Sequence, residues 1–433
     1  MRRLSYFLIP SLAPGGGTRL FNTITKQAYE FQCSFIELIH FAKSDSAVEA
    51  SFLRHGLLID SESYTQSANS LLVQRKLNSQ KVLSITFTVT TKCTGDCVYC
   101  FQRHLERSNS SVDVIDEFLV KLRKTLADTA LRSVYVLIMG GEPMICFDLV
   151  ERLVSGIVGV CSAAGVEHSI IMTANGVLAP EQKLRRLAES GLTDIQVTFD
   201  GNRKVHNFFR PNSYDQVLAN LKLMTKYFSV AIKYNISRDS CRSKVFSEFL
   251  SDFMAQNINS TRYLLEFEPL APSLSQFELP SELFFAPGDS DMAKAIMQLV
   301  RQCLAHGVNA SLGPAIRSPC VGTSDNSIMI QPDGSVQACL MAYDYPGFRI
   351  GSLGTLNSLC VCKDEVRKRV LKAVSTFCAR NECPFLAFCE TGCMLLKDMA
   401  EKTDSVLVCR RDYFESFFPD ITDLILERRK ATS

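Results

Sequence analysis

The sequence has no tryptophan, almost no net charge and no long uninterrupted hydrophobic segment. Its 47 basic and 45 acidic residues give a net charge of +2, which argues against wholesale binding to nucleic acid or to an anionic membrane. No apolar run approaches the roughly 18 residues needed to cross a bilayer. The first residues contain Arg2 and Arg3, but Pro10 interrupts the apolar stretch that follows. We therefore expect no secretory signal, no membrane partner and a cytoplasmic location.

Cysteine, in contrast, is abundant, with 17 residues in the chain. Without a secretory signal, thiolate-bound metal in a reducing compartment explains this number better than a disulfide framework does. One group consists of Cys93, Cys97 and Cys100, and a second group lies between residues 320 and 409. The scattered cysteines are better interpreted as small buried hydrophobic residues; these are Cys33, Cys146, Cys161, Cys241 and Cys303.

The pattern of apolar residues divides the 433 residues into four segments. Residues 1–80 are typical of a small α+β module. Residues 81–285 alternate strands and helices in six βα units, which predicts an α/β fold with a parallel sheet curled into a partial barrel. Residues 286–314 are expected to form a bridging helical region. Residues 315–433 contain the second cysteine group and a C-terminal helix.

Four distinctive sequences follow the first four strands of the predicted barrel. The Cys93 group follows the first strand, residues 140–143 follow the second, Asn175 follows the third and Asp200 follows the fourth. In βα barrels the chemistry is located at the carboxyl ends of the strands. We therefore expect these residues to share one rim.

The first cysteine group has the spacing C-x3-C-x2-C, which places three thiolates around one small object. A structural zinc ion requires four ligands, and the nearest further candidate is His104, outside the group. A four-iron cluster can be held by three cysteines, which leaves one iron free for another ligand. The spacing therefore favours an iron–sulfur cluster over zinc.

This motif, with Tyr99 directly before its last cysteine, resembles the hallmark of the radical S-adenosylmethionine (radical SAM) superfamily. The resemblance implies a partial (β/α)6 TIM-like barrel and a 4Fe-4S cluster on Cys93, Cys97 and Cys100, whose open iron chelates SAM. It also implies that one electron from the cluster cleaves SAM to a 5′-deoxyadenosyl radical, which abstracts a hydrogen atom from a substrate.

The resemblance also implies a SAM-binding rim. Its first part is the GGEP sequence, whose backbone would lie against the SAM amino group because glycine permits a close approach; these residues are Gly140, Gly141, Glu142 and Pro143. Asn175, Asp200 and Asn235 are candidates for contacts with the ribose and adenine. Arg210 is interpreted either as a carboxylate clamp or as a surface charge. His206 is better explained as structural.

Two carboxylates, Glu266 and Glu268, end the sixth predicted strand. They face either the substrate or only solvent, and the sequence does not decide between these positions.

The second cysteine group resembles the SPASM extension of radical SAM proteins, because Cys320, Gly334 and Cys339 have its first spacing. The resemblance implies two auxiliary 4Fe-4S clusters, the first on Cys320, Cys339 and Cys393 and the second on Cys378, Cys383, Cys389 and Cys409. The second set departs from the pattern, because four residues rather than two separate its first two cysteines. The first set lacks an obvious fourth ligand, so either an iron is open to substrate or Cys303, Cys360 or Cys362 binds it. Two zinc sites are the alternative for this region.

SPASM extensions mostly accompany the modification of peptides or proteins. The anaerobic sulfatase maturases have an aspartate directly after the cysteine of the G-x4-C motif, whereas this chain has Leu340, which disfavours that branch. The preferred hypothesis is a maturase of a ribosomally made peptide (a RiPP maturase). It would abstract a hydrogen atom from a precursor peptide and leave a cross-link or another modification.

The segment 1–80 resembles the small leader-binding or winged-helix-like domains that accompany such enzymes. It would either accept a leader peptide at a strand edge or cap the barrel. The expected partners are a precursor peptide and a flavodoxin- or ferredoxin-type electron donor. Two other functions remain open: a radical SAM enzyme with a small-molecule substrate, and a non-enzymatic iron–sulfur electron carrier.

Overall fold

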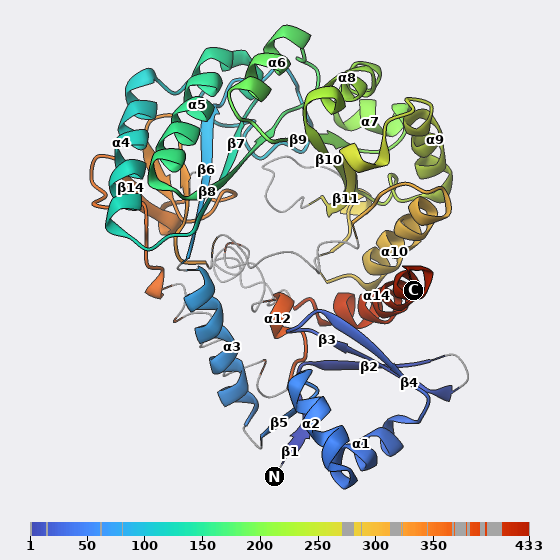
Figure 1. Cartoon of the computed structure of the whole chain (residues 1–433). Helices are drawn as coiled ribbons and strands as arrows, with labels where there is room; N and C mark the ends of the chain where they lie inside the picture. Colours follow the sequence, from blue (N-terminus) through green and yellow to red (C-terminus); the bar gives the residue numbers. More distant parts are fainter. Residues whose placement is uncertain are drawn as a thin grey trace.

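The computed structural model of the chain contains a small amino-terminal module below a larger curled sheet (Figure 1). It describes residues 2–13, 16–60, 63–79, 81–270, 281–286, 288–311, 322, 324–343, 345–365, 368, 378, 382–389, 395 and 409–432. Among these residues, no helix is both long enough and apolar enough to span a membrane.

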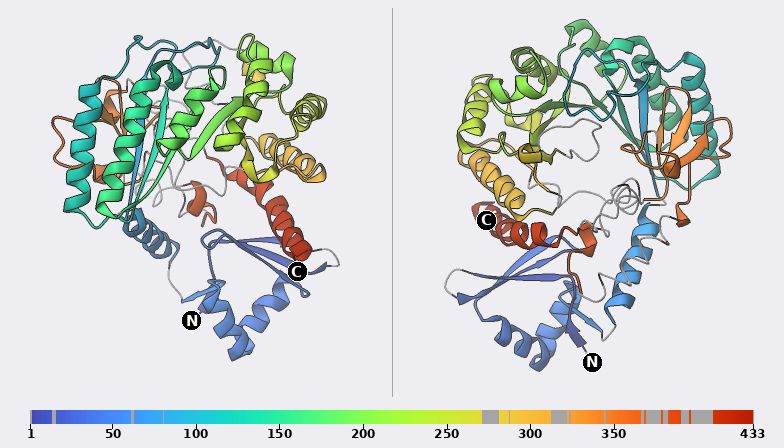
Figure 2. Two further views of the ribbon diagram at one scale, coloured as in Figure 1. Left: turned by 45° about the horizontal axis from the view of Figure 1, so that its top comes forward. Right: turned by 180° about the vertical axis from the view of Figure 1, so that it is seen from behind.

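Six parallel strands form the central sheet, and they are neighbours in the order of the chain. They are β6 (Val82–Thr90), β7 (Ser133–Gly140), β8 (Glu167–Thr173), β9 (Asp194–Phe199), β10 (Ser229–Ile236) and β11 (Tyr263–Pro269). Helices cover the outer face of this curved sheet, as both views in Figure 2 show. The α/β fold with a partial barrel that the sequence predicts is confirmed.

The covering helices follow the strands, and each buries an apolar stripe against the sheet. They are α4 (Val112–Asp128), α5 (Phe147–Ala164), α6 (Glu181–Glu189), α7 (Arg203–Phe209), α8 (Tyr214–Tyr227) and α9 (Ser243–Met254). In α4 the side chains of Ile115, Phe118 and Leu122 are fully buried, as the sequence pattern predicts. The core therefore lies between the sheet and this helical layer, and the carboxyl ends of the strands remain available for a site.

A strand from the carboxyl-terminal region extends the barrel sheet, which the sequence pattern does not predict. This strand, β12 (Ser327–Ile330), pairs in parallel with β6. It continues into β13 (Ser335–Gln337) and β14 (Arg349–Ser352), which pair antiparallel. The second cysteine region is thus joined to the barrel through backbone hydrogen bonds.

The amino-terminal module has a three-stranded antiparallel sheet with the order β2-β3-β4. These strands are β2 (Leu8–Leu12), β3 (Thr18–Asn22) and β4 (Gln27–Phe31), followed by α1 (Phe35–Ser44) and α2 (Ser46–Arg54). These elements agree with the small α+β module that the sequence predicts for residues 1–80. A short pair, β1 (Arg2–Leu4) with β5 (Leu58–Asp60), and the helix α3 (Tyr64–Ser79) complete the module.

The last helix, α14 (Arg411–Thr432), connects this module to the barrel. Phe418 of α14 packs on Phe21 of β3, with their ring centroids 5.0 Å apart. Arg19 of β3 is buried and pairs both with Glu30, at 2.7 Å, and with Asp423 of α14. The three-stranded sheet is therefore fixed to α14 by apolar and ionic contacts.

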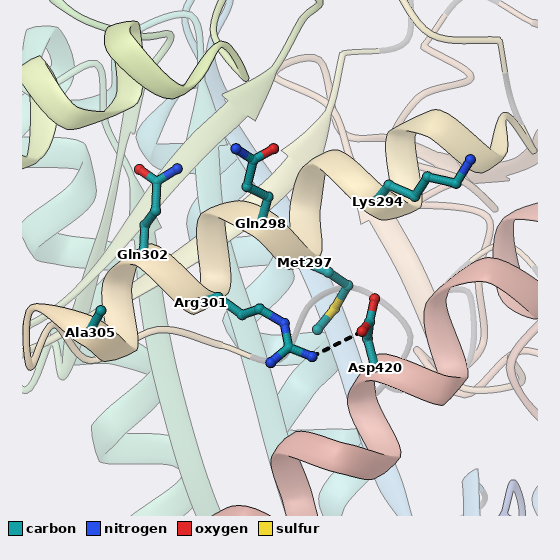
Figure 3. Close-up of a pocket in the computed structure, with 7 residues that line it drawn as sticks. All are labelled: Lys294, Met297, Gln298, Arg301, Gln302, Ala305 and Asp420. Carbon is teal, nitrogen blue, oxygen red and sulfur yellow. Dashed lines mark hydrogen bonds and ion pairs between the residues drawn. The ribbon is translucent and has the colours of Figure 1, made fainter. Parts of the chain in front are cut away.

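The other side of α14 packs against α10 (Ser290–Ala305) of the barrel. Figure 3 shows the open groove between these two helices, where Arg301 of α10 forms an ion pair of 2.9 Å with Asp420 of α14. Because α14 contacts both bodies, the amino-terminal module cannot move independently of the barrel without breaking these contacts.

Candidate functional site

A cavity of about 340 Å³ lies at the carboxyl ends of the barrel strands, where the sequence predicts the site. Its lining includes residues from three of the four predicted motifs, together with three other predicted site residues: Cys93, Cys97, Cys100, Gly140, Gly141, Asn175, Tyr99, Arg210 and Asn235. Asp200, the fourth motif, lies behind this lining and contacts Tyr99 and Asn235. Leu340 and Met341, which follow β13, also line it. Residues from both cysteine regions therefore face one cavity.

The loop that carries the first cysteine group is held in place at both of its ends. At its start, the Thr91 amide donates to the Ser108 carbonyl oxygen at 2.9 Å, and the Arg107 guanidinium donates to the Thr91 carbonyl oxygen at 2.6 Å. At its far end, the Val98 amide donates to the carbonyl oxygen of Phe209 at 3.1 Å. The thiols are therefore presented by an ordered loop.

The thiols themselves lie in surroundings that suit a positively charged metal group. The Gly95 amide donates to the sulfur of Cys93 at 3.3 Å, a contact that favours a thiolate. Burial raises the pKa of the Cys97 thiol to about 11. Bound metal cations would offset this cost, because a coordinating thiol is deprotonated outright.

The arrangement of acidic, histidine and cysteine side chains also bears on which metal group fits. A single zinc ion draws its sulfur ligands to about 2.3 Å. Among the described residues, no set of three or more histidine, cysteine, aspartate or glutamate side chains converges in this way. The three thiols line one cavity, and the preference for a four-iron cluster over zinc rests on their C-x3-C-x2-C spacing, which supplies three ligands rather than four.

The two glycines that follow β7 are required by the chain itself. A Cβ atom at Gly140 would lie 2.3 Å from the carbonyl oxygen of Thr90, and one at Gly141 would lie 2.3 Å from that of Lys92. These short approaches allow the Gly141 amide to donate to the Thr90 carbonyl oxygen at 2.8 Å. The glycines therefore bring the end of β7 against the start of the Cys93 loop.

Replacing Gly141 by alanine is expected to displace the Cys93 loop, because the added methyl group would overlap backbone atoms that cannot rotate away. We expect a loss of stability of about 1–3 kcal/mol or more and a lower iron content after anaerobic reconstitution. Gly159→Ala is the matched control, since nothing lies within 4 Å of its Cβ position on α5. Equal iron contents in Gly141→Ala and Gly159→Ala would contradict this role.

Glu142 connects the second motif to the third. Its carboxylate is fully buried, accepts from the Met144 amide at 2.9 Å and accepts from the Asn175 amide at 2.7 Å. Burial raises the pKa of this carboxyl to about 7, although the two amide donors act in the opposite direction. Asn175 in turn donates through its side chain to the hydroxyl of Thr94 at 3.0 Å, beside Cys93. Glu142 thus has a structural role that the sequence alone does not reveal.

Four of the predicted residues form one hydrogen-bonded network. The Tyr99 hydroxyl donates to Asp200 at 2.8 Å, and the Asn235 amide group donates to Asp200 at 2.7 Å. The Arg210 guanidinium pairs with Asp200 at 2.8 Å and donates to the Tyr99 hydroxyl, also at 2.8 Å. The Arg210 side chain is only 14% exposed and Asp200 is fully buried. Arg210 is therefore not a surface charge, and the carboxylate that it contacts is that of Asp200.

His206 lies behind this network and is fully buried. Its Nδ1 accepts from the Asp200 amide at 3.3 Å, and its Nε2 lies 2.9 Å from the Ser213 hydroxyl. Burial lowers the pKa of His206 to about 4, despite the opposing effect of Asp200. The ring is thus neutral near pH 7, in agreement with the structural role that the sequence favours.

This pKa predicts an acid-dependent loss of stability. Below about pH 6.5 the histidine of the unfolded chain binds a proton, whereas the folded one remains neutral until about pH 4. The free energy of unfolding should therefore fall as the pH falls from 6.5 to 4, by up to about 3 kcal/mol from this group. Denaturant unfolding of the wild type and His206→Gln at pH 5 and 7.5 measures the difference. If both proteins lose the same stability between these pH values, His206 is not the group responsible.

The cavity also contains residues that the motifs do not identify. The cavity is also lined by Gln196 of β9, Lys233 of β10 and Glu268 of β11, which are three neighbouring strands. Of the two carboxylates that end β11, Glu268 thus faces the cavity rather than only solvent. Alternation along the strands is the sequence signal for these residues, because Lys233 and Asn235 are two positions apart and point to the same side.

The second cysteine region is described in part. Cys320 and Cys393 lie outside the described residues, so the proposed first auxiliary set stays a prediction. Burial is the main reason that the pKa of the Tyr64 hydroxyl is raised. The next contributions come from the nearby thiols of Cys383, Cys378 and Cys389. The charge of Cys409 acts in the same way on Cys383. The Cys383 amide donates to the Cys378 carbonyl oxygen at 3.2 Å, which joins two of the four cysteines, and the second auxiliary set also stays a prediction.

Residues 87–237 match the sequence profile described as the Radical SAM superfamily. This part of the chain, which contains the Cys93 loop and most of the barrel strands, is therefore similar to that superfamily. The matched residues contain the strands β7, β8, β9 and β10, the end of β6 and all three cysteines of the first group.

Two curated relatives share the barrel region. The chain is 28% identical over 138 residues to the probable GTP 3′,8-cyclase of Methanothermobacter thermautotrophicus, covering 32% of this chain and 42% of the relative. It is 29% identical over 119 residues to the PqqA peptide cyclase of Bradyrhizobium diazoefficiens, covering 28% of this chain and 29% of the relative. The matched part is less than half the length of either relative.

Among solved structures, SuiB of Streptococcus suis bound to the precursor peptide SuiA superposes with a TM-score of 0.56. The superposition covers 95% of this chain and 100% of SuiB, at 14% sequence identity. At this identity the likeness shows the fold alone, and it extends over both the barrel and the amino-terminal module.

Proposed function

We propose that this protein is a peptide-modifying radical SAM enzyme. The observation that carries the proposal is the single cavity that contains the three thiols of the Cys93 loop and the Gly140–Gly141 backbone. When bound, a 4Fe-4S cluster on these thiols supplies the electron that cleaves SAM into methionine and a 5′-deoxyadenosyl radical. An electron donor of the flavodoxin or ferredoxin type belongs to the proposal, as does a cytoplasmic location.

The residues around the cavity have separate roles in this proposal. Cys93, Cys97 and Cys100 hold the cluster, and the backbone of residues 140–143 lies beside the amino group of SAM. Asn175 and Asn235 contact the rest of the SAM molecule. Arg210 and Tyr99 act mainly by fixing Asp200, since their polar atoms are already engaged with it.

The peptide is the proposed substrate because two different likenesses point in that direction. One relative with sequence similarity in the barrel is a PqqA peptide cyclase, and SuiB, with the same fold, was solved with a precursor peptide. The product is proposed to be a cross-linked or otherwise modified peptide. Leu340, which lines the cavity where the sulfatase maturases would have an aspartate, supports a different reaction from theirs.

Two auxiliary 4Fe-4S clusters complete the proposal. Cys378, Cys383, Cys389 and Cys409 would hold one, and Cys320, Cys339 and Cys393 would hold the other. Cys360 and Cys362 remain candidates for its fourth ligand. We also propose the division into an amino-terminal module, a radical SAM core, a bridging helix and a SPASM region, at the boundaries 80, 285 and 314.

The amino-terminal sheet is the proposed binding site for a leader peptide. Its edge strand β2 contains Pro10, which has no amide hydrogen to offer a partner strand. On the other edge strand, β4, the carbonyl oxygen of Ala28 accepts from Arg429 of α14 at 2.9 Å. A leader that added to β4 would replace Arg429 at this oxygen.

The experiment combines the anaerobically reconstituted enzyme with SAM, a reductant and short peptides encoded beside its gene. We expect one peptide to increase 5′-deoxyadenosine formation and to lose two hydrogens in mass spectrometry. A radical SAM enzyme with a small-molecule substrate is the second candidate, because the other relative is a GTP cyclase. It is supported if guanosine triphosphate or another small molecule, rather than any peptide, stimulates 5′-deoxyadenosine formation.

A further inference from the structure

The amino-terminal module donates two hydrogen bonds to the loop that carries Cys383. The Tyr64 hydroxyl, at the start of α3, donates to the carbonyl oxygen of Cys383 at 2.9 Å. The Thr23 hydroxyl, just after β3, donates to the carbonyl oxygen of Pro384 at 2.8 Å. Two successive carbonyls of the cysteine loop are thus fixed by a part of the chain more than 300 residues away.

The surroundings of Tyr64 make its hydrogen bond difficult to replace. The residue is 4% exposed, and its ring packs edge-on against Tyr6 at 5.4 Å and beside Phe7 at 6.0 Å. Leu386 and Cys339 of the second cysteine region belong to the same buried cluster. Water has little access to this contact, so the Cys383 carbonyl would lose a partner if the hydroxyl were removed.

Tyr64 also lies close to the thiols and not only to the backbone of the loop. The thiols of Cys378, Cys383 and Cys389 are near enough to affect its hydroxyl group. The Cys383 amide donates to the Cys378 carbonyl oxygen at 3.2 Å, which connects the two cysteines within the loop. The hydroxyl is therefore placed beside the loop that carries Cys378 and Cys383, two of the predicted ligands.

We propose that Tyr64 is a positioning residue that sets the reduction potential of the iron–sulfur cluster held by Cys378, Cys383, Cys389 and Cys409. The inference rests on the proposed function, which places a cluster there. Outer hydrogen-bonding partners orient metal ligands and tune the metal, and hydrogen bonds near the sulfurs set cluster potentials. Through Tyr64, the proposed leader-binding module would directly contact the loop that holds the auxiliary cluster.

The test is Tyr64→Phe in the full chain, reconstituted anaerobically and titrated potentiometrically with detection by electron paramagnetic resonance. The reduced cluster would have one more negative charge. The Tyr64 hydroxyl donates to the Cys383 carbonyl oxygen and so offsets the negative end of a dipole that would disfavour the added electron. Without the hydroxyl, the reduction equilibrium of one auxiliary cluster should become about tenfold less favourable, a shift of about 59 mV to lower potential for one electron. The signal of the SAM-binding cluster should not move.

Tyr29→Phe is the matched control, since Tyr29 is in the same module and its ring contacts His55 rather than the cysteine loop. If Tyr64→Phe lowers iron by about four atoms per chain with the fold intact by circular dichroism, the positioning role is also supported. If Tyr64→Phe does not fold, Thr23→Val is measured instead. It should shift the reduction potential of the auxiliary cluster in the same direction by a smaller amount.

If Tyr64→Phe folds and the reduction potential of the auxiliary cluster is unchanged, the inference is overturned. If Tyr64→Phe does not fold, an unchanged potential in Thr23→Val overturns it. A wild-type protein that contains about four irons per chain, or zinc in place of the second cluster, would overturn it too. Formation of 5′-deoxyadenosine, measured on the same samples, reports separately on the proposed function, because it depends on the first cluster alone.

Discussion

Replacement of Cys97 by alanine is expected to lower the rate of 5′-deoxyadenosine formation at least about a hundredfold. Changes in the outer shell of a metal site already cost 10–100-fold, and Cys97 is proposed as a direct ligand. With two of three thiols left, the cluster should be lost, and iron per chain should fall by about four atoms. Iron analysis and chromatographic quantification of 5′-deoxyadenosine after reconstitution measure both effects.

The control for this change is Cys161→Ala. Cys161 is a fully buried cysteine on α5, surrounded by apolar residues and outside the cavity. Its replacement removes one sulfur from the core and should cost about 1 kcal/mol of stability with no loss of iron. If Cys97→Ala retains the iron content and the rate of Cys161→Ala, then Cys97 does not hold the cluster.

Removal of the Asp200 carboxylate is expected to have the second largest effect. In Asp200→Ala, the Arg210 guanidinium keeps its charge in a nearly buried position but loses its partner at 2.8 Å. Breaking a buried ion pair in this way costs about 3–5 kcal/mol. SAM binding should weaken as well, because Tyr99 and Asn235 both donate to this carboxylate.

Denaturant unfolding and equilibrium binding of SAM to the reconstituted protein measure these two losses. Asp116→Ala is the control, since Asp116 forms an exposed ion pair with Arg152 on the outer helices. That variant should lose much less stability and bind SAM normally. The double variant Asp200→Ala/Arg210→Ala should recover part of the stability, because it removes the unpaired charge. Additive losses in the double variant would contradict a direct interaction between the two residues.

The sequence predicts the barrel well because its signals are local. Each of the six strands is a continuous or alternating apolar run, and the helices between them have regular apolar stripes. The four motifs could be assigned to one rim, because parallel strands place their carboxyl ends on the same side. In the structure Cys93, Gly140 and Asn175 line one cavity, and Asp200 is joined to it through its hydrogen bonds with Tyr99 and Asn235.

The contacts between distant parts of the chain could not be predicted in this way. The pairing of β12 with β6 joins a short strand of the carboxyl-terminal region to the first strand of the barrel, and no local pattern specifies the partner. The same holds for Tyr64, which meets Cys383 only through the packing of the amino-terminal module. Arg210 is a further example, because its sequence neighbours do not reveal that it pairs with Asp200 ten positions earlier.

The role of the two glycines after β7 also required the structure. The sequence explains them by the approach of SAM, whereas the structure shows that the chain's own backbone already excludes a side chain there. The predicted approach of SAM and the observed backbone contact concern the same positions, and the backbone contact requires a glycine at position 141 whether or not a ligand is bound.

The central claim is that three thiols at the mouth of this barrel hold an incompletely ligated cluster that cleaves SAM. Its most direct measurement is 5′-deoxyadenosine formation by the wild-type protein, reconstituted with iron and sulfide, reduced and given SAM without any other substrate. We expect slow formation of 5′-deoxyadenosine with an equal amount of methionine. A protein loaded with its full iron content that leaves SAM intact under these conditions would contradict the claim.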